Sequence, residues 1–307
     1  MTTISADAIL TSASRADADR LRRAAVARLV PAALLLPALS FLAVFFALPA
    51  VGLVSYSLLT QAPDGTMGLP ATFEHYRHFF GTSLYSKVLL TTLDISLRTT
   101  GIAVLFAYPV ALVMSRSAPL VRRIITMIVI APLIVSVVVR TYGWELILGN
   151  GPTGILNWLL LTTGVARAPL RLLYTQTAVV IGSLHVFFPM MVLPLASALG
   201  KIDPRLEDAA RTLGATGWRT FRKITLPLSL PGLAVGCTLV FSLTAGSFVT
   251  PAILGGTGAQ MLGMLVDQQI LVVYDWAFGA TVATVLVAIV LAVNIVSLRV
   301  LDRRRAL

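Results

Sequence analysis

The most restrictive feature of this sequence is a series of apolar stretches that lack charge and are about as long as a membrane is thick. The clearest runs from Ala277 to Leu298 without a charged residue. A helix needs about 20 predominantly apolar residues to cross the hydrocarbon core of a bilayer. Hydrophobic residues make up 57% of the chain and charged residues only 12%. We therefore predict an all-α integral membrane protein rather than a soluble one.

Six membrane-spanning helices are the simplest interpretation of these stretches. Asp94 and Arg98 interrupt the second stretch, but residues four apart share one face of a helix and can pair there. The first stretch, from Leu29 to Leu59, is about twice as long as the hydrophobic region of a cleaved signal peptide, which favours a retained helix. The predicted spans are 31–57, 93–115, 121–143, 175–199, 229–253 and 277–300.

The lysines and arginines predict the orientation of these helices, because basic residues are enriched on the cytoplasmic side of membrane proteins. If both termini are cytoplasmic, eighteen of the 24 basic residues lie in cytoplasmic segments. They are Arg15, Arg20, Arg22, Arg23, Arg28, Arg116, Arg122, Arg123, Lys201, Arg205, Arg211, Arg219, Arg222, Lys223, Arg299, Arg303, Arg304 and Arg305. Topology therefore explains the net charge of +11, which does not indicate nucleic-acid binding. We predict a basic cytoplasmic segment at 1–28, a membrane domain at 29–301 and a cytoplasmic tail at 302–307.

A polar segment between the fourth and fifth predicted spans, at about 201–227, contains the signals of two short helices. Asp203 can cap the first helix, and Pro204 suits its first position. Gly214 is placed to end that helix in the left-handed conformation, which glycine adopts at no steric cost. Thr216 can cap the second helix, and Leu226-Pro227 is expected to redirect the chain into the fifth span.

The first short helix would carry one apolar stripe with small residues at its centre. The members of the stripe recur at the i, i+3, i+4 and i+7 spacing of a helical face. They are Leu206, Ala209, Ala210 and Leu213. Small side chains at the centre would let another protein surface approach closely. The alternative interpretation is a helix that lies on anionic lipid, drawn there by neighbouring basic residues.

The same segment carries a longer pattern. An acid and two alanines occupy 208–210, Gly214 follows after three residues, and Ile224-Thr225-Leu226-Pro227 follows after nine more. This pattern resembles the cytoplasmic coupling loop of ABC importer permeases, although aspartate replaces their commoner glutamate and Glu207 precedes it. The resemblance implies that the loop docks into a groove on an ATP-hydrolysing subunit and transmits its motion to the membrane helices. The residues that it assigns to coupling are Asp208, Ala209, Ala210, Gly214, Ala215, Ile224, Leu226 and Pro227.

Further segments extend the resemblance over most of 29–301, and they are similar to permeases for spermidine and putrescine. They are Arg140-Thr141-Tyr142-Gly143-Trp144, Leu148-Gly149-Asn150-Gly151, Leu156-Asn157, Leu172-Leu173-Tyr174-Thr175, Gly182 and the run 187–195. Relatives that carry ferric iron, thiamine, opines or phosphonates share these segments, so they are less specific than the coupling pattern. The arginine-rich beginning and the long first helix resemble the first permease subunit of such systems rather than the second.

This resemblance implies the transmembrane domain of a type I ABC importer in a bacterial inner membrane, with about six helices and a cytoplasmic coupling loop. The implied partners are a cytoplasmic ATPase dimer, a second permease subunit that completes a heterodimer, and an extracytoplasmic substrate-binding protein. ATP hydrolysis is expected in the separate subunit, because the sequence contains no complete Walker-type phosphate loop. No cofactor or metal is expected, since Cys237 is the one cysteine and lies in an apolar run.

Ionisable residues within the predicted spans or at their outer boundary mark a candidate translocation path, because such groups are costly in a membrane and usually face a cavity or the bundle interior. The candidates are Asp94, Glu145 and His185. The two acids could attract a cationic polyamine, but internal pairing with Arg98 and Arg140 is the favoured interpretation. His185 could equally donate a hydrogen bond to another helix or contact the substrate.

Two other functions fit the sequence less well. An ion- or proton-coupled secondary transporter predicts an internal repeat and broken helices around a midplane site, whereas the two halves of this sequence show no clear repeat. An intramembrane enzyme needs paired catalytic groups. The predicted spans contain no paired His, no Cys-His combination and no acid pair at helical spacing.

Overall fold

The computed structural model describes residues 34–62 and 65–305, and the chain divides into two compact units, 1–55 and 56–307. The described part of the first unit belongs to one apolar helix, Leu34–Tyr56, which is long enough to cross a membrane. This helix includes a π-helical turn, η1 (Ala43–Ala47), and α2 (Leu48–Tyr56). It agrees with the first predicted span from its first described residue onward. The basic segment predicted at 1–28 lies outside the described residues.

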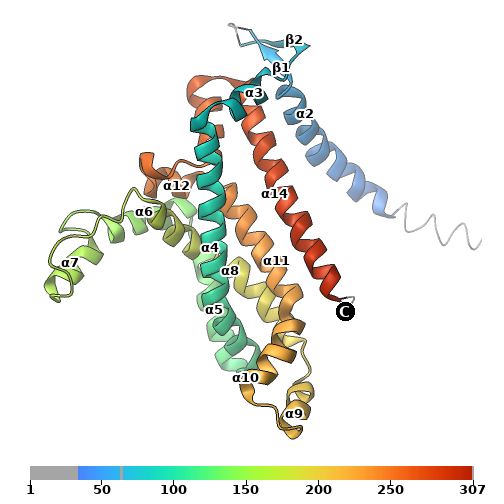
Figure 1. Cartoon of the computed structure of the whole chain (residues 1–307), viewed down its shortest axis with the longest axis vertical. Helices are drawn as coiled ribbons and strands as arrows, with labels where there is room; N and C mark the ends of the chain where they lie inside the picture. The colour runs from blue at the N-terminus through green and yellow to red at the C-terminus, as the bar shows by residue number, and fades with distance from the viewer. Residues whose placement is uncertain (1–33, 63–64, 306–307) are drawn as a thin grey trace, which may run out of the picture. The chain divides into compact units, whose positions relative to one another are not determined.

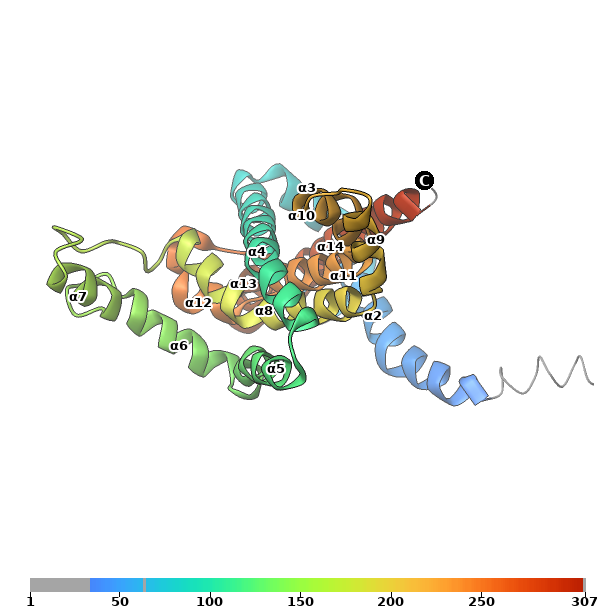
Figure 2. The ribbon, with the colours of Figure 1, turned by 90° about the horizontal axis from the view of Figure 1, so that it is seen from below.

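Four long helices form the centre of the second unit and lie side by side (Figures 1 and 2). They are α4 (Ser83–Arg116), α8 (Gln176–Gly200), α11 (Leu226–Ala245) and α14 (Trp276–Arg305). Small residues let three of them approach closely. Ala103, Ala107 and Ala111 of α4 are buried in a core shared with α8 and α11. At Gly236 of α11, an added Cβ would lie only 2.6 Å from the sulfur of Met191.

The fourth and sixth predicted spans are confirmed by α8 and α14, whereas the second and fifth need correction. Helix α4 begins at Ser83, ten residues before the predicted start, and it runs through Asp94 and Arg98, which form an ion pair within it. Helix α11 ends at Ala245, and Gly246 accompanies a change of direction before the short helix α12 (Val249–Leu254). The predicted fifth span, 229–253, therefore covers two helices.

The third predicted span, 121–143, is wrong as a single straight helix. It consists of α5 (Pro119–Ile134) and α6 (Val137–Leu148), which meet at an angle of 98°. Pro132 lies in the last turn of α5 and lacks the N–H that would continue the helical hydrogen bonds. Counting the described residues, five helices are long and apolar enough to cross a membrane, or six if this bent pair is one span.

The two ends of the long helices carry different structures (Figure 1). At one end, β1 (Leu59–Gln61) pairs antiparallel with β2 (Met67–Ala71), and α3 (Glu74–Gly81) follows. The Gln61 amide donates to the Tyr274 carbonyl at 2.7 Å and accepts from the Trp276 N–H at 2.7 Å, which fixes the hairpin to the beginning of α14. At the opposite end lie α9 (Pro204–Thr212) and α10 (Gly217–Thr220).

The remaining elements are short. Helix α7 (Ile155–Thr162) follows α6, and Figure 2 shows α5, α6 and α7 along one side of the long helices. The segment between α12 and α14 contains η3 (Gly256–Ala259), α13 (Leu262–Gln268) and the π-helical η4 (Gln269–Val273). The hairpin is the one departure from an all-helical chain among the described residues.

Candidate functional site

The first helix of the predicted coupling loop forms by the local signals that the sequence indicates. The Asp203 carboxylate accepts a hydrogen bond from the Arg205 N–H at 2.9 Å, and Pro204 occupies the first helical position. The helix ends at Thr212, and Gly214, which follows the cap residue Leu213, has a φ of 80° in the left-handed region. Around it the Ala215 N–H bonds to the Ala210 carbonyl, and the Gly214 N–H bonds to the Arg211 carbonyl. These two bonds make a Schellman motif, in which the left-handed position favours glycine.

The second helix of the loop also begins as predicted, but it continues into α11 without a break. The Thr216 hydroxyl accepts from the Arg219 N–H at 3.4 Å. Helix α10 then passes through the π-helical η2 (Phe221–Thr225) directly into α11, so that Gly217–Ala245 forms one helical span. The predicted redirection at Leu226-Pro227 is therefore wrong. Pro227 has no N–H to donate to the preceding turn, and it lies next to the π-helical turn η2, where the hydrogen-bond pattern of the helix changes.

The surface of α9 is open in the single chain. Leu213 is 89% exposed and Leu206 is 47% exposed, while Asp208 and Ala209 between them are also exposed. The other predicted coupling residues divide into two groups. Gly214 and Pro227 are exposed, whereas Ala210, Ala215, Ile224 and Leu226 are half-buried. An exposed apolar stripe with a small residue at its centre suits a protein partner that approaches the helix closely.

Glu207, next to the motif acid Asp208, is buried and lies at the centre of a polar cluster. Its side chain is held by two parallel hydrogen bonds from the Arg116 guanidinium at the end of α4. The Thr225 hydroxyl at the end of η2 donates a third bond to Glu207 Oε1 at 2.6 Å. Hydrogen bonding from Arg116 holds the pKa of the Glu207 carboxyl below its usual range, and burial opposes this effect only in part. Sequence reasoning did not find this cluster. Arginine is common at the cytoplasmic end of a membrane span, so Arg116 gave no signal of a distant partner.

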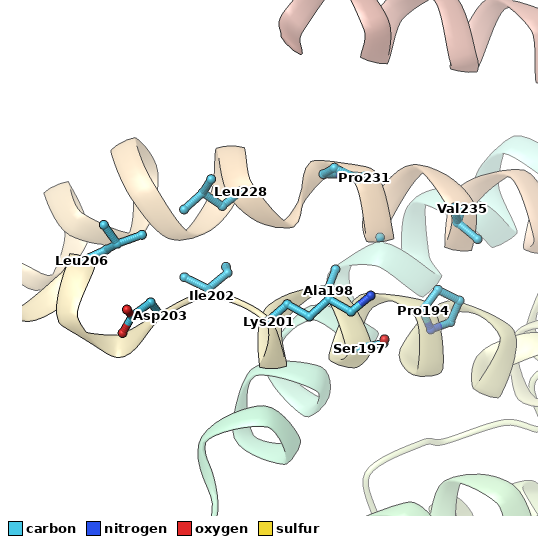
Figure 3. Close-up of a pocket in the computed structure, with 11 residues that line it drawn as sticks. Pro194, Ser197, Ala198, Lys201, Ile202, Asp203, Leu206, Leu228, Pro231 and Val235 are labelled. Carbon is cyan, nitrogen blue, oxygen red and sulfur yellow. The ribbon is translucent and has the colours of Figure 1, made fainter. Parts of the chain in front are cut away.

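A groove separates the first turn of α9 from the long helices. It has a volume of about 590 Å³ and lies between the end of α8, the beginning of α9 and the first half of α11. Figure 3 shows Ile202, Leu206 and Leu228 converging on it, with Asp203 beside them. Pro194, Ala198, Pro231 and Val235 belong to the same lining. The first turn of α9 therefore stands over open space rather than over packed side chains.

The two candidate acids of the translocation path differ in their partners. Arg98 Nε donates to Asp94 Oδ1 at 2.8 Å, which confirms the internal pairing expected for Asp94. The pairing of Glu145 with Arg140 is wrong, since no ion pair joins these two described residues. They are five positions apart on α6, and that spacing turns their side chains to different faces of a helix. Arg140 instead has two buried nitrogens, Nε and Nη1, without a hydrogen-bond partner in the described part of the chain.

His185 of α8 makes a contact between helices, as one of its two interpretations predicts. The Trp144 indole N–H of α6 donates to His185 Nδ1 at 3.0 Å, and the two rings meet edge to face at 5.7 Å. His185 is thus an acceptor in this bond, not the donor that the sequence suggested. The pair also lines a largely apolar cavity of about 480 Å³ with side chains of α4, α5 and α8, among them Phe106 and Phe188. Asp94 and Glu145 do not line this cavity, so the three path candidates are not gathered in one site.

Comparison with known proteins shows which family this chain resembles. Residues 100–306 match the family described as "Binding-protein-dependent transport system inner membrane component". The spermidine/putrescine transport system permease protein PotB of Haemophilus influenzae is 35% identical over 268 residues, which cover 86% of this chain and 93% of that protein. PotB of Escherichia coli is 32% identical over 267 residues, with 86% and 96% covered.

A solved structure shares the fold. One chain of a bacterial ABC transporter involved in the import of the acidic polysaccharide alginate superposes with a TM-score of 0.67 at 18% sequence identity. The superposition covers 92% of this chain and 99% of that chain. The similarity therefore extends over the membrane helices and the segment that contains α9.

Proposed function

Because the chain belongs to the family of binding-protein-dependent transport system inner membrane components, it is a permease subunit of an ABC importer, and we propose that it forms the path for a polyamine. The observation that carries the polyamine proposal is the similarity to PotB of two organisms, at 32–35% identity over 86% of the chain. Spermidine and putrescine are the first substrates to test. An ion-coupled secondary transporter has no support in these similarities.

The proposed assembly contains an ATPase dimer, a second permease subunit as heterodimeric partner and an extracytoplasmic binding protein. We assign the ATPase contact to α9, because its apolar stripe is exposed in this chain and is interrupted by small residues. The same end of the long helices carries Arg116 and Arg122. Basic residues favour the cytoplasmic side, which supports an orientation with both termini in the cytoplasm. The limits of the proposed membrane domain remain 29–301.

In the proposed path, Glu145 and His185 keep a role toward the substrate, while Asp94 is neutralised within its own helix. Glu145 has no ion-pair partner among the described residues, so its charge is available to an ammonium group. His185 and Trp144 line a cavity between α4, α5, α6 and α8, where aromatic faces suit the methylene chain of a polyamine. The coupling residues Asp208, Ala209, Ala210 and Gly214 act at the other end of the subunit, on α9.

Neutralising the two acids one at a time is expected to give different results. Glu145→Gln should lower spermidine uptake several-fold in buffer of low ionic strength and somewhat less in about 0.1 M salt, because salt of that concentration screens charges over about 10 Å but screens a half-buried carboxylate such as Glu145 only in part. Asp94→Asn should change uptake less than about twofold, since an exposed ion pair contributes little. Initial uptake rates into proteoliposomes at several salt concentrations measure both effects. Equal losses in the two variants would contradict the distinction drawn here.

Reconstitution tests the proposed function. The four kinds of component would be purified together and placed in liposomes with labelled spermidine or putrescine outside and ATP inside. We expect uptake that requires ATP, the binding protein and this chain, and we expect no ATP hydrolysis from this chain alone. Uptake driven by an ion gradient without ATP would contradict the proposal, as would ATP-driven uptake of another substrate with no response to polyamines.

A further inference from the structure

The attachment of α9 to the rest of the chain is unusual, because it does not rest on apolar packing. A short surface helix is ordinarily held by an apolar stripe that faces the core. In α9, all of whose residues the structure describes, Glu207 is the single buried residue. Leu206 and the following Leu213 are exposed, and the groove of about 590 Å³ lies beneath the first turn. The polar contacts of Glu207 are therefore the buried attachment of α9 to the rest of the chain, and only the half-buried Ala210 adds to it from the middle of the helix.

Those contacts join three separate elements at one carboxylate. Arg116 is the last residue of α4, and its two terminal nitrogens bond one each to the two Glu207 oxygens. A bidentate arginine–carboxylate pair fixes direction as well as distance. Thr225, the last residue of η2, bonds to the same carboxylate and leads directly into α11. A displacement of Glu207 would therefore pull on both α4, through Arg116, and α11, through Thr225.

A second set of contacts joins α4 and α11 about two turns of α4 away from this cluster. The hydroxyl of Tyr108 on α4 lies 2.8 Å from that of Ser229 on α11. The Tyr108 ring also meets Phe221 of η2 edge to face at 5.4 Å. The ends of α4 and α11 therefore form one connected body, and Glu207 is the point at which α9 joins it.

We propose that Glu207, Arg116 and Thr225 form the joint through which movement of α9 is transmitted to α4 and α11 during transport. This inference rests on the proposed docking of the ATPase on α9. Glu207 and Arg116 are positioning residues, because they act through the helices that they connect. The neighbouring Asp208 is exposed, and in this proposal it contacts the ATPase. Glu207 instead transmits the movement of α9 to the other helices of the same subunit.

The test compares transport with ATP hydrolysis in the reconstituted complex. Glu207→Gln and Arg116→Ala are each expected to lower spermidine uptake per ATP hydrolysed by at least tenfold. Exchanging the charges, with Arg116→Glu and Glu207→Arg in one chain, should restore part of that ratio. Arg122→Ala is the matched control. Arg122 also bonds to the last turn of α4, through the Met114 and Ser115 carbonyls, but no hydrogen bond or ion pair joins it to α9 among the described residues. Its ratio should stay within about twofold of wild type.

Arg116→Lys keeps the charge but loses the bidentate geometry, which provides a milder variant if the others do not assemble. It should yield normal amounts of complex with a reduced ratio. A wild-type ratio in Glu207→Gln or Arg116→Lys would overturn the inference, and so would a loss of assembly in every variant of the cluster, which would indicate a merely structural role. A wild-type complex that takes up no polyamine would instead contradict the proposed substrate. In that case, the measurement of coupling would be the increase in ATP hydrolysis that the binding protein with its bound substrate causes, compared between the wild type and the variants of the cluster.

Discussion

Gly214→Val is expected to lower ATP-driven uptake by about 5- to 30-fold while the protein still inserts into the membrane. Gly214 has a φ of 80°, and a Cβ added there would meet no other atom within 4 Å. The cost therefore lies in the backbone conformation and not in a collision. A side chain in the left-handed region costs about 1–2 kcal/mol, which corresponds to a change of about 5- to 30-fold in a conformational equilibrium. The loop would leave the geometry that presents α9 to its partner.

Two further variants isolate this cause. Asparagine tolerates the left-handed region better than other residues with a side chain, so Gly214→Asn should retain most of the uptake. Gly217 is the matched control, because it begins α10, has no left-handed φ and also has open space around its added Cβ. Gly217→Val should cost less than about twofold. Uptake in assembled complexes measures all three, and similar losses at the two glycines would exclude the left-handed turn as the reason.

Ala209→Trp is expected to reduce the amount of ATPase that co-purifies with the permease by at least tenfold. Ala209 is exposed near the centre of the α9 stripe, between Leu206 and Leu213. A large side chain at this position would keep a partner surface from approaching the helix. The buried cluster around Glu207 lies on another side of α9 and should stay intact, so the yield of the membrane protein should not fall.

A series of side-chain sizes separates contact from folding in this experiment. Ala209→Ser should retain the ATPase, and Ala209→Leu should have an intermediate effect. The measurement is the ratio of ATPase to permease after purification through a tag on the permease. A ratio that does not depend on the size of the side chain would show that α9 is not the docking surface, and it would favour the alternative in which α9 lies on lipid.

Local signals predicted the two short helices of the segment 201–227, although not the continuation of the second helix through Leu226-Pro227. The Asp203 cap, the glycine stop at Gly214 and the Thr216 cap all involve residues within a few positions of one another. Such contacts are encoded in the nearby sequence, whatever the rest of the chain does. The apolar spans that form α8 and α14 were predicted for a related reason. The length and hydrophobicity of an uninterrupted stretch can be read from that stretch alone.

Long-range contacts account for what the sequence did not predict. Arg116 and Glu207 are 91 positions apart, and no pattern in either segment indicates that they meet. The 98° angle between α5 and α6 has a local signal in Pro132, but proline does not specify the direction of the bend. Glu145 was assigned to Arg140 by proximity in sequence, although a spacing of five residues does not favour contact on a helix.

Cross-linking from α9 tests most directly whether this helix is the coupling element. The chain's single cysteine, Cys237, would be replaced by serine, and a photoactivatable maleimide would be attached to Leu213→Cys in membranes that contain the whole complex. Leu213 is 89% exposed at the end of the α9 stripe and already carries a large side chain, so a probe there leaves the small residues at the centre of the stripe free. The control is Glu74→Cys, an exposed position on α3 at the opposite end of the long helices. We expect a product that contains the ATPase from Leu213→Cys and none from Glu74→Cys. An assembled complex in which Leu213→Cys yields no ATPase product, or in which both positions yield it equally, would contradict the account.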